Sequence, residues 1–345
     1  MVTIKEVAKA ANVSLATVSR VINNADNVAP KMRERVLAAI KELGYFPNNI
    51  ARALVNRRAG SIAILLRNLH SPFYFDLIRG FEAGSAETEY SVIFCSSGQK
   101  PDERERYLQY LTNGVTDGII IYGSFFSDQP LVEHLHEINF PFLLIENDIH
   151  NIEVNSLLIN NFDGARRAVE YLIENGHSKI AYLCFDPNKK AHIDRLNGYT
   201  STMQRYGLPI RASYIQHLYL DDDHVSAAVE KLLGLPDEER PTAIFCSNDE
   251  MAAVAIESAM QLGARVPDDV SVVGFDNQSI LPKPYHGPAI TSVSQPFYEM
   301  GRDSVRMLLN ILENKDVPPI HKIYDTQLVI RDTVRNITPG IIRPQ

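Results

Sequence analysis

Side chains suited to hydrogen bonding and close contact gather on one face of a short helix predicted at about residues 15–22. The members of this outward face are Leu15, Ala16, Ser19, Arg20 and Asn23, and the apolar residues opposite them are Val18, Val21 and Ile22. An Arg side chain pairs with the acceptor edge of guanine, and an α-helix fits the major groove of B-DNA. Leu15 and Ala16 can touch base edges or a thymine methyl group, whereas Ser14, Thr17 and Asn23 are better placed to contact phosphates. This face therefore predicts recognition of double-stranded DNA.

A helix before it is predicted to hold this face in position. Thr3 stands three residues before Glu6, which is the spacing of a capping box at a helix start. Residues 4–11 then carry an apolar stripe at helical spacing. After a short break, Ser14 is a good N-cap for the second helix. The pattern is that of two short helices joined by a tight turn.

A third predicted helix completes a basic head. It begins at about Pro30, which suits a first turn, and Gly44 suits its C′ position. Residues 1–60 hold ten Lys and Arg against four Asp and Glu, whereas the remainder holds 24 against 38. A basic head on an acidic body is typical of a DNA-binding module. The helical spacing alone also fits a three-helix bundle that binds no nucleic acid.

Residues 46–60, FPNNIARALVNRRAG, form a candidate hinge after this head. Pro47 ends the preceding helix, and Asn48 or Asn49 can cap a new one. That helix falls well short of the ~12–15 residues that an isolated helix needs in water, so we expect it to be ordered only when something packs on it. Leu54 with flanking Arg residues suits an element that wedges into the minor groove and kinks DNA. The alternative is a solvated linker between two domains.

From Ser61 onwards the pattern changes to strands that alternate with helices. The first series has strands at 61–66, 91–95, 118–121 and 141–145 and helices at about 75–88, 102–113 and 129–138. The second series has strands near 156–159, 179–184, 215–219, 242–246 and 270–274 and helices near 163–175, 193–206, 223–234 and 249–262. Short buried strands separated by helices predict parallel sheets covered on both faces. Two series predict two doubly wound halves with a cleft between them.

Near its end the chain is predicted to return to the first half. TSVSQP at 291–296 precedes a helix at about 297–313, and HKIYDTQLVIR then supplies one last strand. We therefore divide the chain into a head (1–45), a hinge (46–60) and a core (61–335). The core has an N-subdomain of about 61–158 and 293–320 and a C-subdomain of about 159–290 and 321–335.

Sequence signals of catalysis, metal binding and membrane insertion are absent. The chain has no GxxxxGK[ST], GxGxxG or GxSxG motif and no apolar stretch long enough to span a bilayer. HLHE at 134–137 has the wrong spacing for a zinc helix, and DDDH at 221–224 fits a helical first turn better than a metal site. Cys95, Cys184 and Cys246 each end an apolar run, so we expect buried reduced thiols. We predict a protein that is not an enzyme and has no metal or cofactor.

Polar and aromatic side chains follow the predicted strands at their carboxyl ends, where ligands bind in open α/β folds. Those of the first half are Ser71, Phe73, Tyr74 and Glu146, and those of the second half are Arg195, Asn248, Asp249 and Asp276, with Gln295 on a crossover. Sugar hydroxyls need partners such as Asp, Asn and Arg, together with an aromatic face for the sugar ring. These residues predict a polar ligand of sugar size. Asn248 and Asp276 could instead cap helices, and Phe73 could belong to the core.

The string TIKEVAKAANVSLATVSRVINN at 3–24 closely resembles the DNA-binding head of the lactose/galactose repressor (LacI/GalR) family, and LGYFPNNIARAL at 43–54 resembles its hinge. The resemblance covers about residues 2–332. It implies an all-α helix-turn-helix head joined to an α/β periplasmic-binding-protein-like core of two doubly wound subdomains. It also implies a cytoplasmic transcriptional regulator, usually a repressor, that binds operator DNA as a homodimer or a tetramer and does not associate with membranes. A small-molecule effector between the subdomains would control the hinge and hence the affinity for DNA.

The resemblance also assigns residues to each site. The DNA-contacting positions that it implies are Thr3, Ser14, Leu15, Ala16, Thr17, Ser19, Arg20, Asn23, Tyr45, Asn48, Ala51, Arg52 and Leu54. Leu54 would be the wedge at the central base step, with Ala51 and Arg52 in the groove. The positions that match effector-binding positions of the family are Arg195, Asn248 and Asp276, and the further candidates are Ser71, Phe73, Tyr74, Glu146, Tyr219 and Gln295.

Departures from the family pattern bear on the ligand. The chain has no Trp, so an aromatic platform must be Phe or Tyr, for which Tyr219 is one candidate. Asn160 stands where the family commonly has Asp, and Lys189 and Ala191 stand where a purine-responsive member would offer other groups. A sugar is therefore favoured over a purine, and we expect a repressor of a sugar-utilisation operon. Two alternatives stay open: a solute-binding module without a DNA role, and control by a phosphoprotein corepressor.

Overall fold

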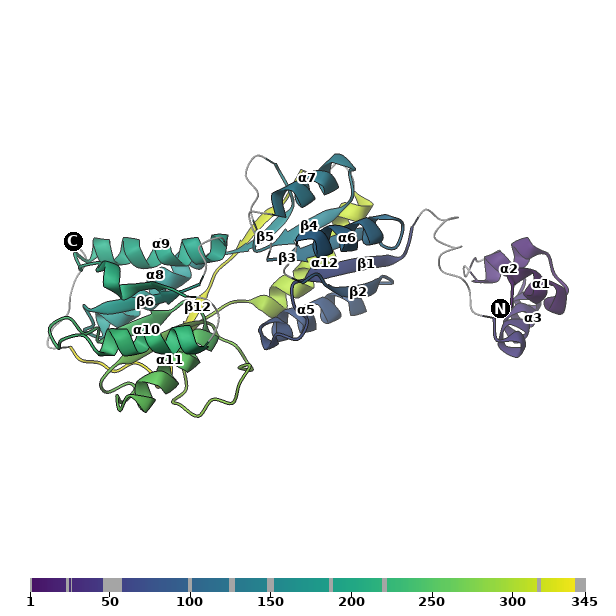
Figure 1. Ribbon diagram of the computed structural model, residues 1–345. Coiled ribbons are helices and arrows are strands. Elements are labelled where there is room, and N and C mark those ends of the chain that lie inside the picture. The colour runs from purple at the N-terminus through teal and green to yellow at the C-terminus, as the bar shows by residue number, and fades with distance from the viewer. Residues whose placement is uncertain are drawn as a thin grey trace. The chain divides into compact units, whose positions relative to one another are not determined.

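The computed structural model describes residues 2–22, 25, 27–45, 58–98, 101–123, 128–147, 152–185, 189–218, 222–314 and 318–338. The chain forms two compact units, a head within the first 60 residues and a core that begins at Ser61, and each is described by itself (Figure 1). Six predicted contact residues lie outside the described residues, namely Asn23, Asn48, Ala51, Arg52, Leu54 and Tyr219. The short helix predicted within the hinge, from Ile50 to about Asn56, lies outside them too.

Three helices form the head, as predicted: α1 (Ile4–Ala11), α2 (Leu15–Ile22) and α3 (Pro30–Leu43). The predicted capping box is confirmed, because Thr3 and Glu6 exchange side-chain and backbone hydrogen bonds at the start of α1. Ser14 caps α2, since its Oγ accepts a hydrogen bond from the Thr17 amide at 3.1 Å. Gly44 ends α3 in the left-handed conformation with φ of 60°, which costs a glycine little.

The first sheet of the core has the strand order β11-β5-β4-β3-β1-β2, and its adjacent strands pair in parallel. The strands are β1 (Ser61–Leu66), β2 (Ser91–Ser96), β3 (Gly118–Tyr122), β4 (Phe142–Ile145), β5 (Ser156–Ile159) and β11 (His321–Tyr324). The helices of this half are η1 (Pro72–Tyr74), α5 (Phe75–Ala86), α6 (Pro101–Thr112), α7 (Gln129–Glu137) and α12 (Phe297–Glu313). Alternate residues of β1, namely Ile62, Ile64 and Leu66, pack with the buried side chains of α5 and α12.

The second sheet has the order β12-β10-β9-β8-β6-β7 and is parallel except for the antiparallel pair β10 and β12. The strands are β6 (Ile180–Cys184), β7 (Ile215–His217), β8 (Ala243–Cys246), β9 (Ser271–Asp276), β10 (Thr291–Ser294) and β12 (Gln327–Val329). The helices are α8 (Asn161–Glu174), α9 (Lys190–Arg205), η3 (Ala212–Tyr214), α10 (Asp222–Leu233) and α11 (Asp249–Gln261). One face of the sheet packs against α8 and α9 and the other against α10 and α11, which gives the predicted doubly wound arrangement.

Three short segments carry the chain between the two sheets, at β5 to α8, at β10 to α12 and at β11 to β12. Two sequence assignments are wrong here. The strand at 156–159, which we placed in the second series, pairs with β4 in the first sheet. Residues 321–324, which we placed in the C-subdomain, pair with β5, so HKIYDTQLVIR forms two strands in different sheets. No Gly or Pro interrupts the chain at 160 or at 325–326, so the sequence does not mark where it leaves a sheet.

Helices α5 and α12 approach each other closely through glycines. A Cβ atom on Gly301 would meet backbone atoms of Leu77, Phe81 and Gly80 at 3.0 Å or less, and one on Gly80 would meet backbone atoms of α12 equally closely. These contacts join the helix that begins after β1 to the helix that follows the second crossover. The packing therefore fixes segments distant in the sequence against the same face of the first sheet.

We expect Gly301→Ala to lower the free energy of unfolding of the core by about 1–3 kcal/mol, because the added methyl group overpacks two backbones that cannot move apart freely. In an open helix the same change would raise stability by up to about 1 kcal/mol, so the sign of the effect is diagnostic. Urea denaturation followed by circular dichroism measures it. Glu82→Ala, at an exposed position of α5, is the matched control and should leave stability nearly unchanged. A stabilised Gly301→Ala variant would contradict the close packing.

Candidate functional site

Helix α2 presents to solvent the face that the sequence predicted. Leu15, Ala16 and Arg20 are exposed, Thr17 and Ser19 are partly exposed, and Ser14 is exposed at the start of the helix. The opposite face is buried in the small apolar core of the head formed by Val7, Ala8, Ala11, Val18, Val21, Val36 and Ala39. A large apolar side chain such as Leu15 on a protruding helix beside Arg20 can contact base edges in a groove.

Contacts within the head fix the direction of α2. Asn12 ends α1 in the left-handed conformation with φ of 49°, which turns the chain sharply before Ser14. The Arg35 guanidinium from α3 donates a hydrogen bond to the Ala11 carbonyl at 2.5 Å, so α3 holds the turn. Of the other predicted DNA contacts, Thr3 is exposed with its hydroxyl on the Glu6 carboxylate, and Tyr45 is half-buried against the head core.

In the core, the Arg195 side chain joins polar groups from several strand ends. Its Nε donates a hydrogen bond to Asn161 Oδ1 at 2.9 Å, and its Nη1 lies 3.2 Å from Asp276 Oδ1. Nη1 also donates to the Ser247 carbonyl, and the guanidinium carbon lies 3.7 Å from the ring centroid of Phe275. Arg195 is 5% exposed, and the planar guanidinium can contact all of these partners at once. Arg195 therefore links Asn161, after the first crossover, to Asp276, at the end of β9.

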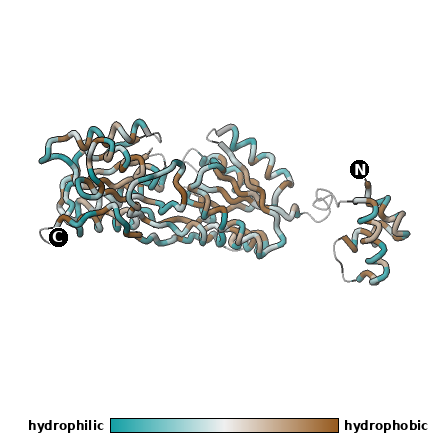
Figure 2. Tube along the Cα trace, turned by 90° about the horizontal axis from the view of Figure 1, so that it is seen from below, coloured by the Kyte–Doolittle hydropathy of each residue, from teal (hydrophilic) through white to brown (hydrophobic). Residues whose placement is uncertain are grey.

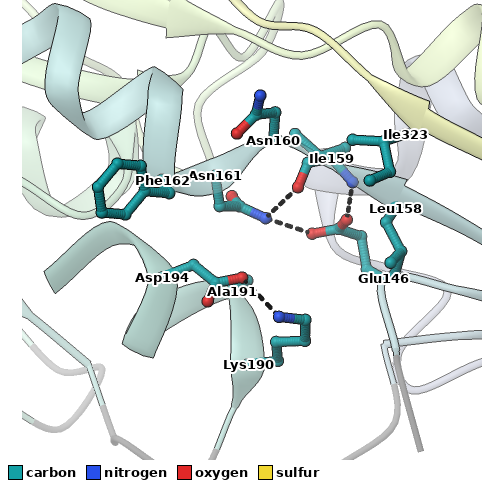
Figure 3. Close-up of a pocket in the computed structure, with 10 residues that line it drawn as sticks. All are labelled: Glu146, Leu158, Ile159, Asn160, Asn161, Phe162, Lys190, Ala191, Asp194 and Ile323. Carbon is teal, nitrogen blue, oxygen red and sulfur yellow. Dashed lines mark hydrogen bonds and ion pairs between the residues drawn. The ribbon is translucent and has the colours of Figure 1, made fainter. Parts of the chain in front are cut away.

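A cavity of about 220 Å³ lies at the carboxyl end of β5 and the first turns of α8 and α9 (Figure 3). Glu146 anchors its polar side, because its Oε1 accepts a hydrogen bond from the Ile159 amide at 2.6 Å and its Oε2 accepts one from Asn161 Nδ2 at 2.9 Å. Lys190 Nζ donates to Asp194 Oδ2 at 3.0 Å on the opposite wall. The remaining lining residues are Leu158, Asn160, Phe162, Ala191 and Ile323.

A second cavity of about 70 Å³ brings both halves of the core together. Its lining residues are Pro72, Phe73, Asp76, Asp276, Asn277, Gln278, Ser279, Ser294, Gln295 and Phe297. The two halves meet directly here, because Ser279 Oγ donates a hydrogen bond to Asp76 Oδ2 at 2.7 Å. Phe73 packs edge-to-face on Phe297 with ring centroids 5.0 Å apart, which supplies an aromatic side.

Burial raises the pKa of three carboxyl groups in this region. The pKa of Glu146 rises to about 7, because burial outweighs the hydrogen bond from Asn161 and the charge of Arg195. The pKa of Asp276 rises to about 6, since burial outweighs the favourable charge of Arg195. The pKa of Asp249, which accepts hydrogen bonds from Ser292 Oγ and the Gln278 amide, rises to about 7 through burial. The region thus concentrates acidic groups whose ionisation the fold opposes.

The structure brings some predicted ligand residues together and separates others. Phe73, Glu146, Asp276 and Gln295 line the two cavities, and Arg195 connects them. Tyr74 is 7% exposed and packs in the core of the first half, and Ser71 precedes η1 outside both cavities. Asn248 also lies outside them and caps α11, with its Oδ1 accepting from the Met251 amide at 2.8 Å, which is the alternative that the sequence left open.

Several residues of these cavities were not singled out from the sequence, among them Asp76, Asn161, Gln278, Ser279 and Phe297. Asn161 stands two residues after the end of β5, so the rule that identified Asp276 applied to it as well. Asp76 and Ser279 come from different halves, and their contact depends on tertiary structure. Phe297 follows the crossover residue Gln295, but its apolar side chain gave no sign of a position beside a polar cavity.

The sequence also predicted features of the chain that bear on catalysis and membranes. Cys95, Cys184 and Cys246 are buried free thiols, as predicted. Within the described residues, no group of three or more His, Cys, Asp and Glu side chains could hold a metal ion. In the same part of the chain no helix is long and apolar enough to cross a membrane.

Comparison with known proteins agrees with this two-part design. Residues 3–48 match the family described as bacterial regulatory proteins, lacI family, and residues 169–334 match the periplasmic binding protein-like domain. Catabolite control protein A of Priestia megaterium is 35% identical over 320 residues, which cover 92% of this chain and 94% of that protein. The structure of the Lac repressor dimer bound to operator and the anti-inducer ONPF has a TM-score of 0.85 at 28% identity, covering 97% of this chain and 99% of that one. A complex of the transcriptional regulator CelR with cellobiose has a TM-score of 0.72 at 30% identity, covering 96% of this chain and 100% of that one.

A helix-turn-helix head and an α/β core of two sheets thus define a DNA-binding transcriptional regulator with an effector-binding core. The chain belongs to the lacI family of bacterial regulatory proteins. The resemblance found in the sequence is therefore confirmed, and the alternative of a solute-binding module without a DNA role no longer stands.

The raised pKa of Asp249 predicts how stability depends on pH. Between the ordinary value of 3.8 and about 7 the folded chain keeps a proton that the unfolded chain has lost, so this group lowers the free energy of unfolding as pH rises. Asp249→Asn does not titrate. Between about pH 4 and about pH 7.5, the free energy of unfolding of this variant should therefore rise relative to that of the parent protein. The rise should exceed about 1.4 kcal/mol, the equivalent of one pKa unit.

Urea denaturation at both pH values measures the difference. Asp332→Asn, which removes an exposed carboxyl group, is the control and should show no such gain. A difference between Asp249→Asn and the parent protein that stays constant over this pH range would show that burial does not perturb Asp249.

Proposed function

We propose that this protein is a cytoplasmic repressor of a sugar-utilisation operon that binds its operator as a homodimer or a tetramer and is controlled by a carbohydrate effector held in the core. The single observation that carries the proposal is the convergence of Arg195, Asp276 and Gln295 with residues of both halves around small polar cavities. The family relationship supplies the DNA-binding role. The solved CelR–cellobiose complex supports a sugar as the class of effector.

For DNA recognition, the proposal uses the exposed face of α2. Leu15, Ala16, Ser19 and Arg20 would contact base edges in the major groove, whereas Ser14 and Thr17 would contact phosphates. Two heads related by a two-fold axis would read the two half-sites of a near-palindromic operator, which requires at least a dimer. Asn23, Tyr45, Asn48, Ala51, Arg52 and Leu54 complete the proposed set of contacts.

For effector binding, the proposal places sugar hydroxyls on groups of complementary chemistry. Asp276, Glu146 and the ring of Phe73 line the cavities, and the two carboxylates would accept hydrogen bonds while the ring would offer an apolar surface to the sugar. Arg195, which contacts Asn161 and Asp276 beside the cavities, would donate hydrogen bonds. The effector would bridge the two halves and change their closure. Three crossover segments would pass this change through the core, and the hinge would respond by folding on DNA or releasing it.

The central experiment is a gel shift of the purified full-length protein on the DNA upstream of its own gene, with and without a panel of sugars. We expect specific binding to this DNA and a change of about 5–150-fold in affinity with one of the sugars, the usual size of allosteric coupling. The direction of the change distinguishes an inducer from a corepressor. Failure to prefer this DNA over random DNA of equal length would refute the proposed repressor role.

We expect Arg20→Ala to relax base preference by about 1–3 kcal/mol, because a bidentate contact to a base edge is lost. The measurement is the ratio of affinities for operator and random DNA at fixed salt. Lys31→Ala removes an exposed charge from α3 and is the matched control, for which both affinities should fall together. Equal losses on both DNAs for Arg20→Ala would identify Arg20 as a phosphate contact instead.

We expect Asp276→Asn to weaken effector binding about 10–100-fold, because a hydrogen bond to a charged group contributes about 1.5–3 kcal/mol. The side chain keeps its size, and operator affinity without effector should stay within a factor of about 2. Titrating the effector into the protein–operator complex gives the first quantity, and a gel shift gives the second. Asp332→Asn serves again as the exposed control, and an unchanged effector titration of Asp276→Asn would exclude Asp276 from the site.

A further inference from the structure

Two amide oxygens in the 70 Å³ cavity, Gln278 Oε1 and Gln295 Oε1, have no hydrogen-bond donor among the residues that the structure describes. Gln295 is 7% exposed, and its Nε2 donates to the Asp276 carboxylate, which can only accept. A hydrogen bond from Gln278 to Asp276 fixes the second amide in the same way. Both amides are thus oriented with their oxygens away from Asp276. A buried acceptor without a donor costs about 1–3 kcal/mol.

The carboxylates of this cavity, in contrast, already have donors. Asp276 pairs with Arg195 and accepts from both glutamines. Asp76 accepts from Ser279 Oγ at 2.7 Å and pairs with Arg79 at 3.2 Å. The unmet requirement is therefore for donors to two neutral amide oxygens, which a hydroxyl group meets without carrying a charge.

The charged side chains that line the two cavities oppose an anion. Among the described lining residues, Asp76, Glu146, Asp194 and Asp276 are acidic and Lys190, which pairs with Asp194, is basic. Arg195 lines neither cavity, and its Nε and Nη1 are directed to Asn161, Ser247 and Asp276. The buried Arg67 and Arg104 contact Asp128 and line neither cavity. A phosphate or carboxylate on the ligand would thus face acidic groups in partly buried surroundings.

We infer that the effector is an uncharged, hydroxyl-rich molecule, that two of its hydroxyls donate to Gln278 Oε1 and Gln295 Oε1, and that the site rejects phosphorylated or carboxylated forms of the same molecule. The inference rests on the proposed function only in placing the effector in the core. It narrows the class of effector from carbohydrates in general to neutral sugars and polyols.

The test measures binding to the full-length protein in the absence of DNA, by thermal unfolding and by calorimetry. The probes are cellobiose, glucose, ribose and xylose, with glucose 6-phosphate, glucuronate and ribose 5-phosphate as anionic partners. We expect at least one neutral probe to raise Tm and its anionic counterparts to bind at least about 10-fold more weakly, a difference of about 1.4 kcal/mol. Tighter binding of an anionic probe than of its neutral parent would overturn the inference, and so would the absence of any shift with the neutral probes.

Substitutions of opposite charge at Gln278 test the role of the cavity. Gln278→Lys should move the ratio of neutral to anionic affinity towards the anion by about 10-fold, and Gln278→Glu should move it the other way. If Gln278 had only a structural role, the ratio of neutral to anionic affinity would shift in the same direction in both variants or would not shift in either. Gln204→Lys, at an exposed position of α9, is the control for net charge and should leave the ratio unchanged.

These measurements separate the inference from the proposed function. Because they contain no DNA, a protein that prefers neutral sugars yet ignores its upstream DNA would uphold the inference and refute the repressor role. A protein that binds operator DNA and releases the DNA when a sugar phosphate is added would uphold the repressor role and refute the inference.

Discussion

The core depends on the neutralisation of one buried cation. Arg195 projects from α9 into a region where desolvating a guanidinium without partners would be prohibitive, and it is accommodated by groups from separate segments of the chain. Asn161 comes from the start of α8, and Asp276 comes from the end of β9. Asn161 and Asp276 also stand beside the two cavities. A ligand that contacts either residue would therefore change the interactions that offset the desolvation of the Arg195 guanidinium.

Much of the fold could be predicted because its signals are local. The capping box at Thr3 and Glu6, the cap at Ser14 and Gly44 after α3 each leave a residue-level mark on the sequence, and buried parallel strands appear as short apolar runs. The crossovers could not be assigned in the same way. Pairing of β11 with β5 and of β12 with β10 depends on contacts between segments more than 30 residues apart, and only a short polar link separates β11 from β12.

The residues of the candidate site likewise fall into those that local sequence signals reveal and those that depend on tertiary contacts. Glu146, Arg195, Asp276 and Gln295 could be found because each is a polar residue at a strand end, in a nearby helix or on a crossover. The same rule also selected Asn248, which caps α11, because a polar residue after a strand has two uses and the sequence does not distinguish them. Asp76 and Ser279 could not be found, because nothing in either local sequence predicts that the first turn of α5 meets the loop after β9.

The hydrogen bond that joins Ser279 to Asp76 across the two halves is weak enough for the proposed neutral ligand to be comparable with it. The hydrogen bond from Ser279 to Asp76 is exposed, and a bond of this kind contributes about 0.5–1.5 kcal/mol. Two hydrogen bonds from a ligand to Gln278 and Gln295 would contribute a similar amount each. Their sum lies in the range of about 1–3 kcal/mol that typifies coupling between sites. The proposed control of the core would therefore need no charged ligand, because a few neutral hydrogen bonds are comparable with the hydrogen bond that they would reinforce.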